Sequence, residues 1–427
     1  MIGRSLLPAF ANARDTLQAH HEGGRALLST IGSIHDGERY RLKDREKALV
    51  FEKLATSAPC SRKWIAEQTG IRPTTVSWAV KELIEERFVT AVAAVEGDRP
   101  GRPAVLLQLE FNRLVAVSMY VQARELRTAL INLAEEIVAE HIEPLAPDTD
   151  NREFLQACVR SFAVIGRHVP AGAEILGIAL SLVGTVASGN NTWVSAARWR
   201  NIRALDFGLL SEQLGLPVTI SRMQDSELEY LVQKNLAYQQ KDVLFVHWGF
   251  GIGAAYAHGG AVMGSTIGRF CEIGHTRLSL DHGKPCQCGA VGCLETEAAL
   301  WAIRAEIAED IRGSLTDERE LGRTMRCPEI ADHPAITRAT HNVMLALLNI
   351  HQIFYPDVIV IAGPFTENEV VFGRLCRFLR SQLPDYARDQ VEIRAVTADF
   401  RGCARGSVYR FFRSRLKQLL TLRATAN

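Results

Sequence analysis

The sequence predicts an α/β protein in which an N-terminal winged helix-turn-helix precedes two similar α/β lobes with a cleft between them. Three helical patterns, a glycine turn between the second and third, and two β-like runs succeed one another before residue 110. From about Phe111, apolar strand-like runs alternate with helical patterns. The order of strands followed by helices occurs twice, which is typical of a duplicated α/β fold.

Length and composition set the broad class. A chain of 427 residues is too long for one ordinary domain, and 47% hydrophobic with 23% charged residues is a globular composition. A net charge of +1 provides no global attraction to nucleic acid, so such binding requires a local patch. Three of the nine cysteines are clustered, which does not resemble a disulfide framework and fits a reducing compartment. With no apolar run of membrane-spanning length and no signal-peptide core, we expect a cytoplasmic protein without membrane association.

Three regions are expected along the chain. Residues 1–40 form a leader of unassigned role, with one short helix over Leu6 to Leu17, and residues 41–110 form the winged helix-turn-helix. Residues 111–427 form the two lobes and include a zinc loop at 275–293.

The helix-turn-helix is predicted from its start and stop signals. A first helix begins near Lys43, Ser61 is placed to cap the second, Gly70 ends it, and Pro73 suits the first turn of the third. Ala66 and Ile71 would pack the second helix against the third. The buried face of that third helix, residues 73–87, is expected to contain Val76, Val80, Leu83 and Ile84.

In this arrangement the third helix presents its other face to the DNA major groove. Hydroxyl side chains reach phosphates and base edges, while basic side chains neutralise phosphates, and the wing tip can enter a minor groove. Residues 41–103 contain twelve Lys and Arg against nine Asp and Glu. The alternative is that the unit mediates only protein contacts. The candidate DNA-binding residues are Arg72, Thr74, Thr75, Ser77, Trp78, Lys81, Arg99 and Arg102.

The two lobes are expected to follow one plan. In the first, an antiparallel meander of three strands over 113–145 precedes further strands and helices, and in the second a long strand comes first. The remaining expected segments of the first lobe are helix 152–168, strand 174–186, helix 205–214, strand 217–222 and helix 226–237. Those of the second are strand 242–263, helices 295–309 and 336–352, strand 357–363, helix 372–383, strand 391–396 and a terminal helix.

A cluster of soft ligands follows the second lobe's first strand. Cys286, Cys288 and Cys293 fall within eight residues, and His275 lies upstream. Three thiolates and one imidazole form a complete tetrahedral set for Zn²⁺ and leave no open position for water, which predicts a structural site. The alternative is a group of free cysteines in a reduced protein.

Four segments resemble the ROK family of repressors, open reading frames and sugar kinases, and are similar to its xylose- and N-acetylglucosamine-type repressors. They are the winged helix through GRP (Gly101 to Pro103), GFGIGA (Gly249 to Ala254), EIGH (Glu272 to His275) and CQCGAVGCLE (Cys286 to Glu295). The resemblance extends from about residue 45 to the C-terminus. It implies a two-lobed actin-like/sugar-kinase (ribonuclease H-like) ATPase fold, a structural zinc, a sugar site between the lobes, and homodimers or homotetramers.

The resemblance also implies effector-binding residues, namely Asp225, Glu272, His275 and Glu295. Carboxylates suit sugars because their oxygens accept hydrogen bonds from neighbouring hydroxyls. His275 would bind zinc through one ring nitrogen and face the ligand with the other. Alternatively, Glu272 and Glu295 support the metal site, and Asp225 caps the following helix.

Two departures from the family's kinases argue against phosphoryl transfer. Residues 115–133 contain no glycine where kinases have a DxGGT turn that wraps the ATP phosphates, and Ala362-Gly363-Pro364 replaces a Gly-Gly pair. The kinases' Asn-Asp pair is Gln224-Asp225, so the carboxylate of the base is kept. Arg198 and Trp199 are expected to replace a sugar contact of the kinases or to fill its space, and Arg269 and Phe270 to add bulk and charge near the cleft. Arg198 and Arg269 would suit an acidic sugar or a phosphosugar; the alternatives are surface arginines and a pocket without an effector.

We therefore expect a transcriptional regulator, usually a repressor in this family, rather than an enzyme. It would bind operator DNA and respond to a sugar held between the lobes. One alternative is a regulator controlled by a protein partner. Another is a sugar kinase with an attached DNA-binding domain.

Overall fold

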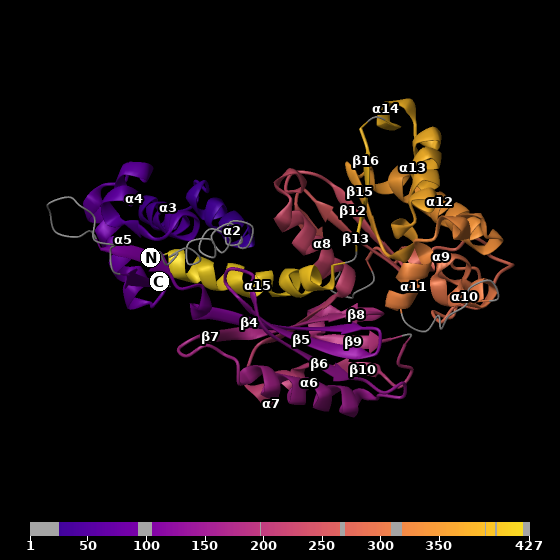
Figure 1. Ribbon diagram of the computed structural model, residues 1–427, viewed down its shortest axis with the longest axis horizontal. Coiled ribbons are helices and arrows are strands. Elements are labelled where there is room, and N and C mark those ends of the chain that lie inside the picture. The colour runs from indigo at the N-terminus through magenta and orange to yellow at the C-terminus, as the bar shows by residue number, and fades with distance from the viewer. Residues whose placement is uncertain are drawn as a thin grey trace, which may run out of the picture.

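The computed structural model describes residues 25–92, 105–196, 198–264, 270–308, 318–388, 390–397 and 399–421. A helical head lies at one end of the molecule, and two α/β lobes extend from it (Figure 1). The expected helix over Leu6 to Leu17, the GRP segment, Arg99, Arg102 and Arg269 lie outside the described residues. None of the described helices is long and apolar enough to span a bilayer.

The head has the expected helices and a three-stranded sheet of order β1-β3-β2. The Ser61 hydroxyl accepts a hydrogen bond from the Trp64 backbone N–H, and Gly70 adopts a left-handed conformation with φ 69°, so both helix-end predictions are confirmed. The elements of the head are α2 (Arg25–His35), α3 (Leu42–Ser57), β1 (Cys60–Ser61), α4 (Arg62–Thr69), α5 (Pro73–Glu85), β2 (Val89–Val92) and β3 (Leu106–Leu109).

The head differs from expectation at two places. Ile84 was assigned to the buried face of α5 but is 37% exposed, and Ala79 is buried instead. Helix α2 lies within the leader and was not expected. Its Leu27, Ile31 and Ile34 are buried in the same core as the helices of the head.

The first lobe is built on a five-stranded sheet of order β11-β7-β4-β5-β6, in which the predicted antiparallel meander is present. The predicted strand 174–186 stops at Leu182, because Gly184 turns the chain with φ 85°, and residues 205–206 are strand rather than helix. The lobe comprises β4 (Leu114–Gln122), β5 (Glu125–Asn132), β6 (Ile137–Pro144), α6 (Asn151–Gly166), β7 (Glu174–Leu182), β8 (Thr185–Ala187), β9 (Thr192–Ser195), β10 (Arg203–Asp206), α7 (Gly208–Leu214), β11 (Val218–Arg222) and α8 (Met223–Lys234).

The second lobe has a sheet of order β14-β13-β12-β15-β16. The stretch 242–263, expected as one strand, forms three antiparallel strands, and the helix expected at 295–309 is divided between α9 and α10. The lobe comprises β12 (Val243–Trp248), β13 (Ile252–His258), β14 (Ala261–Met263), the 3₁₀ turn η4 (Ile273–His275), α9 (Leu294–Ala298), α10 (Leu300–Ala308), α11 (Glu318–Met325), α12 (Pro334–Phe354), β15 (Val358–Ala362), the 3₁₀ turn η6 (Pro364–Glu367), α13 (Glu369–Gln382), α14 (Asp385–Arg388), β16 (Glu392–Val396) and α15 (Phe400–Leu420).

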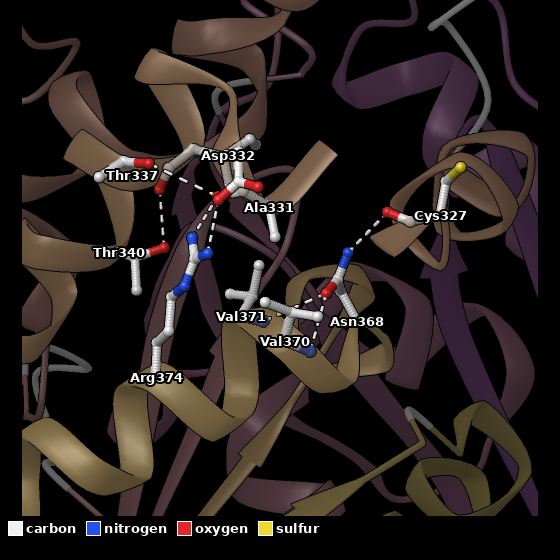
Figure 2. A network of polar contacts seen from close by, with 10 residues as sticks. Cys327, Ala331, Asp332, Thr337, Thr340, Asn368, Val370, Val371 and Arg374 are labelled. Carbon is white, nitrogen blue, oxygen red and sulfur yellow. Dashed lines mark hydrogen bonds and ion pairs between the residues drawn. The ribbon is translucent and has the colours of Figure 1, made fainter. Parts of the chain in front are cut away.

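A polar network fixes the turn after β15. The Asn368 side chain caps α13 by accepting from the Val370 and Val371 backbone N–H groups, and its amide donates to the Cys327 carbonyl (Figure 2). One turn further along α13, Arg374 donates to the Ala331 carbonyl and pairs with Asp332. Because both residues tie α13 to the segment before α12, the turn between β15 and α13 is held rigidly.

The two sheets have the same plan, three antiparallel strands followed by two parallel ones, so the predicted duplication is confirmed. Helices α8 and α15 cross between the lobes, and each contacts the sheet of the other lobe. Helix α8 follows the first sheet but contacts β13 of the second, whereas α15 follows the second sheet but covers β4 and β7 of the first. At their crossing a Cβ on Gly406 would lie 1.9 Å from the Ser226 carbonyl oxygen, so only glycine permits this approach.

Helix α15 also reaches the head. It runs from the interlobe region toward the helices of the head (Figure 1). Leu416, Leu419 and Leu420 at its end are buried in the same core as Ile31 and Ile34 of α2. One continuous helix therefore contacts the first sheet, the partner helix α8 and the head.

Candidate metal centre and interlobe site

The predicted zinc ligands converge. The ligand atoms of His275, Cys286, Cys288 and Cys293 all lie within 4.8 Å of one another. His275 Nδ1 lies 3.5 Å from Cys286 Sγ, and the sulfurs of Cys288 and Cys293 are 3.7 Å apart. One ion could therefore reach all four atoms.

Local backbone geometry explains why the ligands meet. Short antiparallel bridges pair Arg277 with Cys293 and Pro285 with Val291, which brings both ends of the loop together. Gly292 has φ 71°, and a Cβ there would lie 2.6 Å from the Ser279 carbonyl oxygen. Glycine is therefore required at the point where the chain doubles back.

The donor set fits zinc. Three sulfurs and one imidazole nitrogen match the ligands and the number of a closed structural site. Burial and the hydrogen bonds to the other two thiols together raise the pKa of Cys293 to about 12. A bound divalent cation would instead favour the thiolates, because its charge stabilises them.

An arginine at the lobe boundary joins two predicted effector residues. Arg222, at the end of β11 in the first lobe, makes two hydrogen bonds to Asp225 at 2.6 and 3.1 Å. The third guanidinium nitrogen donates to Glu272 of the second lobe at 3.3 Å. Burial raises the pKa of both carboxyls, and Arg222 opposes this. The arginine thus balances two half-buried carboxylates and links the lobes.

Sequence reasoning missed Arg222. A signal was present, since the arginine precedes Asp225 by three residues at the expected start of a helix, a spacing at which side chains meet. The expectation that Asp225 is the N-cap of α8 is wrong, because Arg222 is the N-cap residue and Asp225 lies inside the first turn.

The other two effector candidates lie beside the first pair. Glu295 accepts a hydrogen bond from the Trp301 indole at 3.1 Å and lies close to Gly274 of the EIGH segment and Gly251 of the GFGIGA turn. The charges of His275 and Glu295 both act on Glu272, in opposite directions. The structure therefore gathers the four predicted residues around one place between the lobes, with His275 Nδ1 directed at the metal ligands.

Among the described residues that were expected to alter the sugar pocket, Arg198 alone contacts both lobes. Its guanidinium lies 4.4 Å from the ring centre of Phe250 in the GFGIGA turn. The expectation for Trp199 is wrong, because this side chain is fully buried in the first lobe and donates to the Ala146 carbonyl. Phe270 packs edge-to-face against Phe354 of α12.

Two turns correspond in sequence to the segments with which the family's kinases contact the nucleotide, and in this chain both turns are short or closely packed. Strands β4 and β5 are joined by a two-residue turn at Ala123 and Arg124, with φ 52° at Ala123. In the second lobe, the rings of Trp248 and Phe365 stack at 4.1 Å and are fully buried. A Cβ on Gly363 would lie 2.2 Å from the Trp248 carbonyl oxygen, so the turn after β15 closes directly on the end of β12.

On the head, most candidate DNA-contacting side chains of α5 face solvent. Arg72, Thr74, Ser77 and Lys81 are exposed, and Thr75 is half-buried. Trp78 is also half-buried; its outer ring face carries the Lys43 ammonium at 3.9 Å, and its other side packs on the core. An ion pair of 2.8 Å between Lys47 and Glu82 fixes α5 on α3. Thus α5 is a rigid helix with a polar outer face.

The chain was compared with known proteins. A profile of the ROK family matches residues 119–409. The DNA-binding transcriptional repressor Mlc of Escherichia coli K12 is 23% identical over 371 residues, which covers 84% of this chain and 91% of Mlc. The DNA-binding transcriptional dual regulator NagC of the same strain is 24% identical over 368 residues, covering 82% of this chain and 86% of NagC.

Solved structures give the same picture for the fold. A ROK family transcriptional regulator described as a homologue of E. coli Mlc superposes with a TM-score of 0.67 at 19% identity, covering 89% of this chain and 99% of that one. The ROK hexokinase of Thermus thermophilus gives 0.56 at 19% identity and covers 70% of this chain and 99% of the hexokinase. The regulator thus matches a larger share of this chain than the kinase does.

Proposed function

The chain belongs to the ROK family, and from this premise we propose that it is a DNA-binding transcriptional regulator of carbohydrate metabolism, acting as a repressor. The observation that carries the proposal is the helical head joined to the lobes. The regulators Mlc and NagC match this chain over most of their own lengths. The head supplies the DNA-binding surface, and the lobes supply the sensor.

Operator recognition is assigned to α5. Two heads of a homodimer, or of a dimer within a homotetramer, would place this helix in successive major grooves of a palindromic site. Thr74 and Ser77 on the outer face are short enough to approach bases and phosphates, and Lys81 adds a positive charge. Arg72 stands at the N-terminal end of the same helix. In the wing, Arg99 and Arg102 would contact the flanking backbone or minor groove.

The metal centre is assigned a structural role. His275, Cys286, Cys288 and Cys293 would hold one Zn²⁺, which cross-links the loop when bound. Glu272 lies three residues before the first ligand and Glu295 two residues after the last. The loop therefore sets the positions of two of the carboxylates that face the cleft.

The effector is assigned to the interlobe site of Asp225, Glu272, His275 and Glu295. A sugar hydroxyl entering this site would compete with Arg222 for the Asp225 and Glu272 oxygens. Because Arg222 links the lobes, such an exchange would alter how the lobes are held together. Helix α15 would carry the change to the head, since one end contacts α8 and the other is buried in the head core.

Kinase activity is not proposed. Phosphoryl transfer depends on backbone N–H groups and cations that position and neutralise the phosphates. The two-residue turn between β4 and β5 offers no glycine-rich cradle, and the turn after β15 closes on β12. A carboxylate at Asp225 without these elements cannot position ATP.

The test is a titration of neutral hexoses and amino sugars against the purified protein bound to its genomic target fragment. We expect one sugar class to change the DNA affinity, by a factor of about 5–150 for ordinary allosteric coupling. Glu295→Gln should weaken that response while leaving DNA binding without sugar unchanged. If no sugar changes the affinity, the effector assignment fails, and control by a protein partner becomes the better account. ATP consumption with any hexose would contradict the regulator assignment.

A further inference from the structure

A pocket of about 240 Å³ lies where β11, α8 and α15 meet, bordered by β14 of the second lobe. Thr219, Ile220 and Ser221 of β11 line it together with Gly406, Arg410 and Arg413 of α15, whereas Val218 is buried in the core of the first lobe. Arg222 and Asp225 form one end of it. Glu272, His275 and Glu295 are not among its lining residues, whereas Arg222 and Asp225 belong to both, so the pocket adjoins the carboxylate site between the lobes and shares this pair with it.

Its lining carries more positive than negative charge. Arg222, Arg410 and Arg413 face Asp225 and Glu229. Arg222 is paired with Asp225, and Arg413 is paired with Glu229 at 2.7 Å. Within the described part of the chain, no carboxylate forms an ion pair with Arg410.

Arg410 is partly exposed and lies near a second positive charge. Partial burial lowers its pKa, and the neighbouring charge of Arg413 lowers it further. Both residues project from one face of α15, three positions apart, toward the same pocket. An anion between them would relieve the repulsion and satisfy the N–H groups of Arg410.

The other lining groups suit an oxyanion. Thr219 and Ser221 on β11 bring hydroxyls to the lining, whereas the Ser407 hydroxyl on α15 already bonds to the Ala404 carbonyl and to Ser118. Hydroxyls donate to phosphate oxygens, and a guanidinium matches them with two parallel N–H groups. The volume is about eight times the roughly 30 Å³ share of one water molecule in the liquid, which leaves room for a phosphoryl group with a small organic part.

We propose that this pocket binds a small phosphate-bearing metabolite, with the phosphoryl group held by Arg410 and Arg413 and by the hydroxyls of Thr219 and Ser221. This binding does not depend on the proposed DNA-binding function. Because the walls come from both lobes and from α15, an occupant would stabilise one arrangement of the lobes over others.

The test is isothermal titration calorimetry in a phosphate-free, low-chloride buffer, with inorganic phosphate, glucose 6-phosphate and glucose as separate titrants. The wild-type protein should bind at least one of the two phosphates, and glucose should not compete with it. Binding of inorganic phosphate alone identifies the free ion as the ligand, whereas tighter binding of the ester identifies a phosphorylated metabolite. Absence of heat from both phosphates overturns the proposal.

Three variants locate the site. Arg410→Gln should raise the Kd by about tenfold or more, as expected for a lost charge-assisted hydrogen bond. Arg410→Lys keeps the charge but not the paired N–H groups, so its Kd should lie between those of the wild type and Arg410→Gln. Arg380→Gln removes an exposed positive charge from α13 and should have no effect. Wild-type affinity in Arg410→Gln overturns the proposal.

A fourth variant separates this site from the interlobe effector site. Glu295→Gln should leave phosphate binding intact even if it removes the response to sugar. If Glu295→Gln instead abolishes phosphate binding, the anion occupies the cleft and the proposal is wrong. Because binding is measured directly, a failure of the regulator assignment does not affect the outcome.

Discussion

Single residues at the lobe boundary decide how this chain uses its kinase-like fold. Arg222 forms ion pairs with Asp225 and Glu272, so two carboxylates suited to sugar hydroxyls are satisfied by the protein itself. A buried pair that loses one partner costs several kcal/mol, because the remaining charge is then buried alone. A ligand at this site must therefore replace the contacts that Arg222 makes.

Another carboxyl, that of Glu227, is expected to control the pH dependence of stability. Glu227 on α8 is 4% exposed, and burial raises its pKa to about 8. The hydrogen bond that the Asp399 backbone N–H donates to this carboxyl lowers the pKa and opposes the effect of burial. The unfolded-state pKa is about 4.3, so the folded state retains a proton that the unfolded state releases. The free energy of unfolding should therefore fall as the pH rises from about 4.3 to 8.

Glu227→Gln removes this titration and should flatten the profile. Urea unfolding at pH 5, 6, 7 and 8 should show that the free energy of unfolding of the variant increases relative to that of the wild type at each step. The difference should be largest near pH 8. An unchanged slope in the variant would mean that Glu227 titrates normally. A similar outcome would follow if the carboxylate had a cation partner.

Zinc removal provides the second prediction at this scale. Cys288→Ser should purify with little zinc, since an alcohol is a poor ligand for this metal, whereas Cys327→Ser should retain the wild-type amount. Cys327 is exposed, lies outside the cluster and serves as the matched control. Metal content is measured by mass spectrometry of the purified proteins. Equal zinc in Cys288→Ser and the wild type would contradict the ligand assignment.

At the scale of elements, the crossing of α8 and α15 is the most constrained feature. Gly406→Ala places a methyl group 1.9 Å from the Ser226 carbonyl oxygen, which forces the two helices apart. Overpacking of this kind costs about 1–3 kcal/mol or more, so a clear decrease in Tm is expected.

Gly166→Ala is the control for this change. Gly166 ends α6, and a Cβ added there would meet no atom within 4 Å, so alanine should be neutral or stabilising at this position. Equal thermal stability of Gly406→Ala and the wild type would mean that α15 can move away from α8 at no cost. The lobes and the head would then not be coupled through this helix.

Elements with strong local signals were predictable from the sequence. The capped helices α4 and α5 and the meander β4 to β6 have helix-end residues or apolar patterns that depend only on neighbouring residues. The ligands of the metal centre were predictable for the same reason, since three of them lie within eight residues.

Other features depend on contacts between distant segments and were not predictable. Helix α2 packs against α3 and also against α15, which lies far along the chain, and the crossing of α8 and α15 joins residues 180 positions apart. Trp199 was misassigned because a tryptophan near a cleft motif looks the same in sequence whether it faces the cleft or the core. The contact between Arg222 and Glu272 arises only when both lobes are folded.

At the scale of the whole molecule, one helix links the lobes, which we propose as the sensor, to the head, which we propose as the DNA-binding unit. A sugar changes DNA affinity only if it binds one lobe arrangement better than another. In the proposed regulator, helix α15 provides a physical route for that difference, because a shift at its crossing with α8 would displace Leu416, Leu419 and Leu420, which are buried in the head core. The central claim is therefore that the head recognises a defined operator.

The most direct test uses purified full-length protein and sheared genomic DNA from the source organism, with bound fragments recovered and sequenced. The account predicts strong enrichment of fragments that share a palindromic motif and lie beside genes of carbohydrate metabolism. Enrichment should be lost in a variant carrying Ser77→Asp on the outer face of α5 and kept in Arg380→Gln. Uniform recovery of genomic DNA without a shared motif would contradict the account.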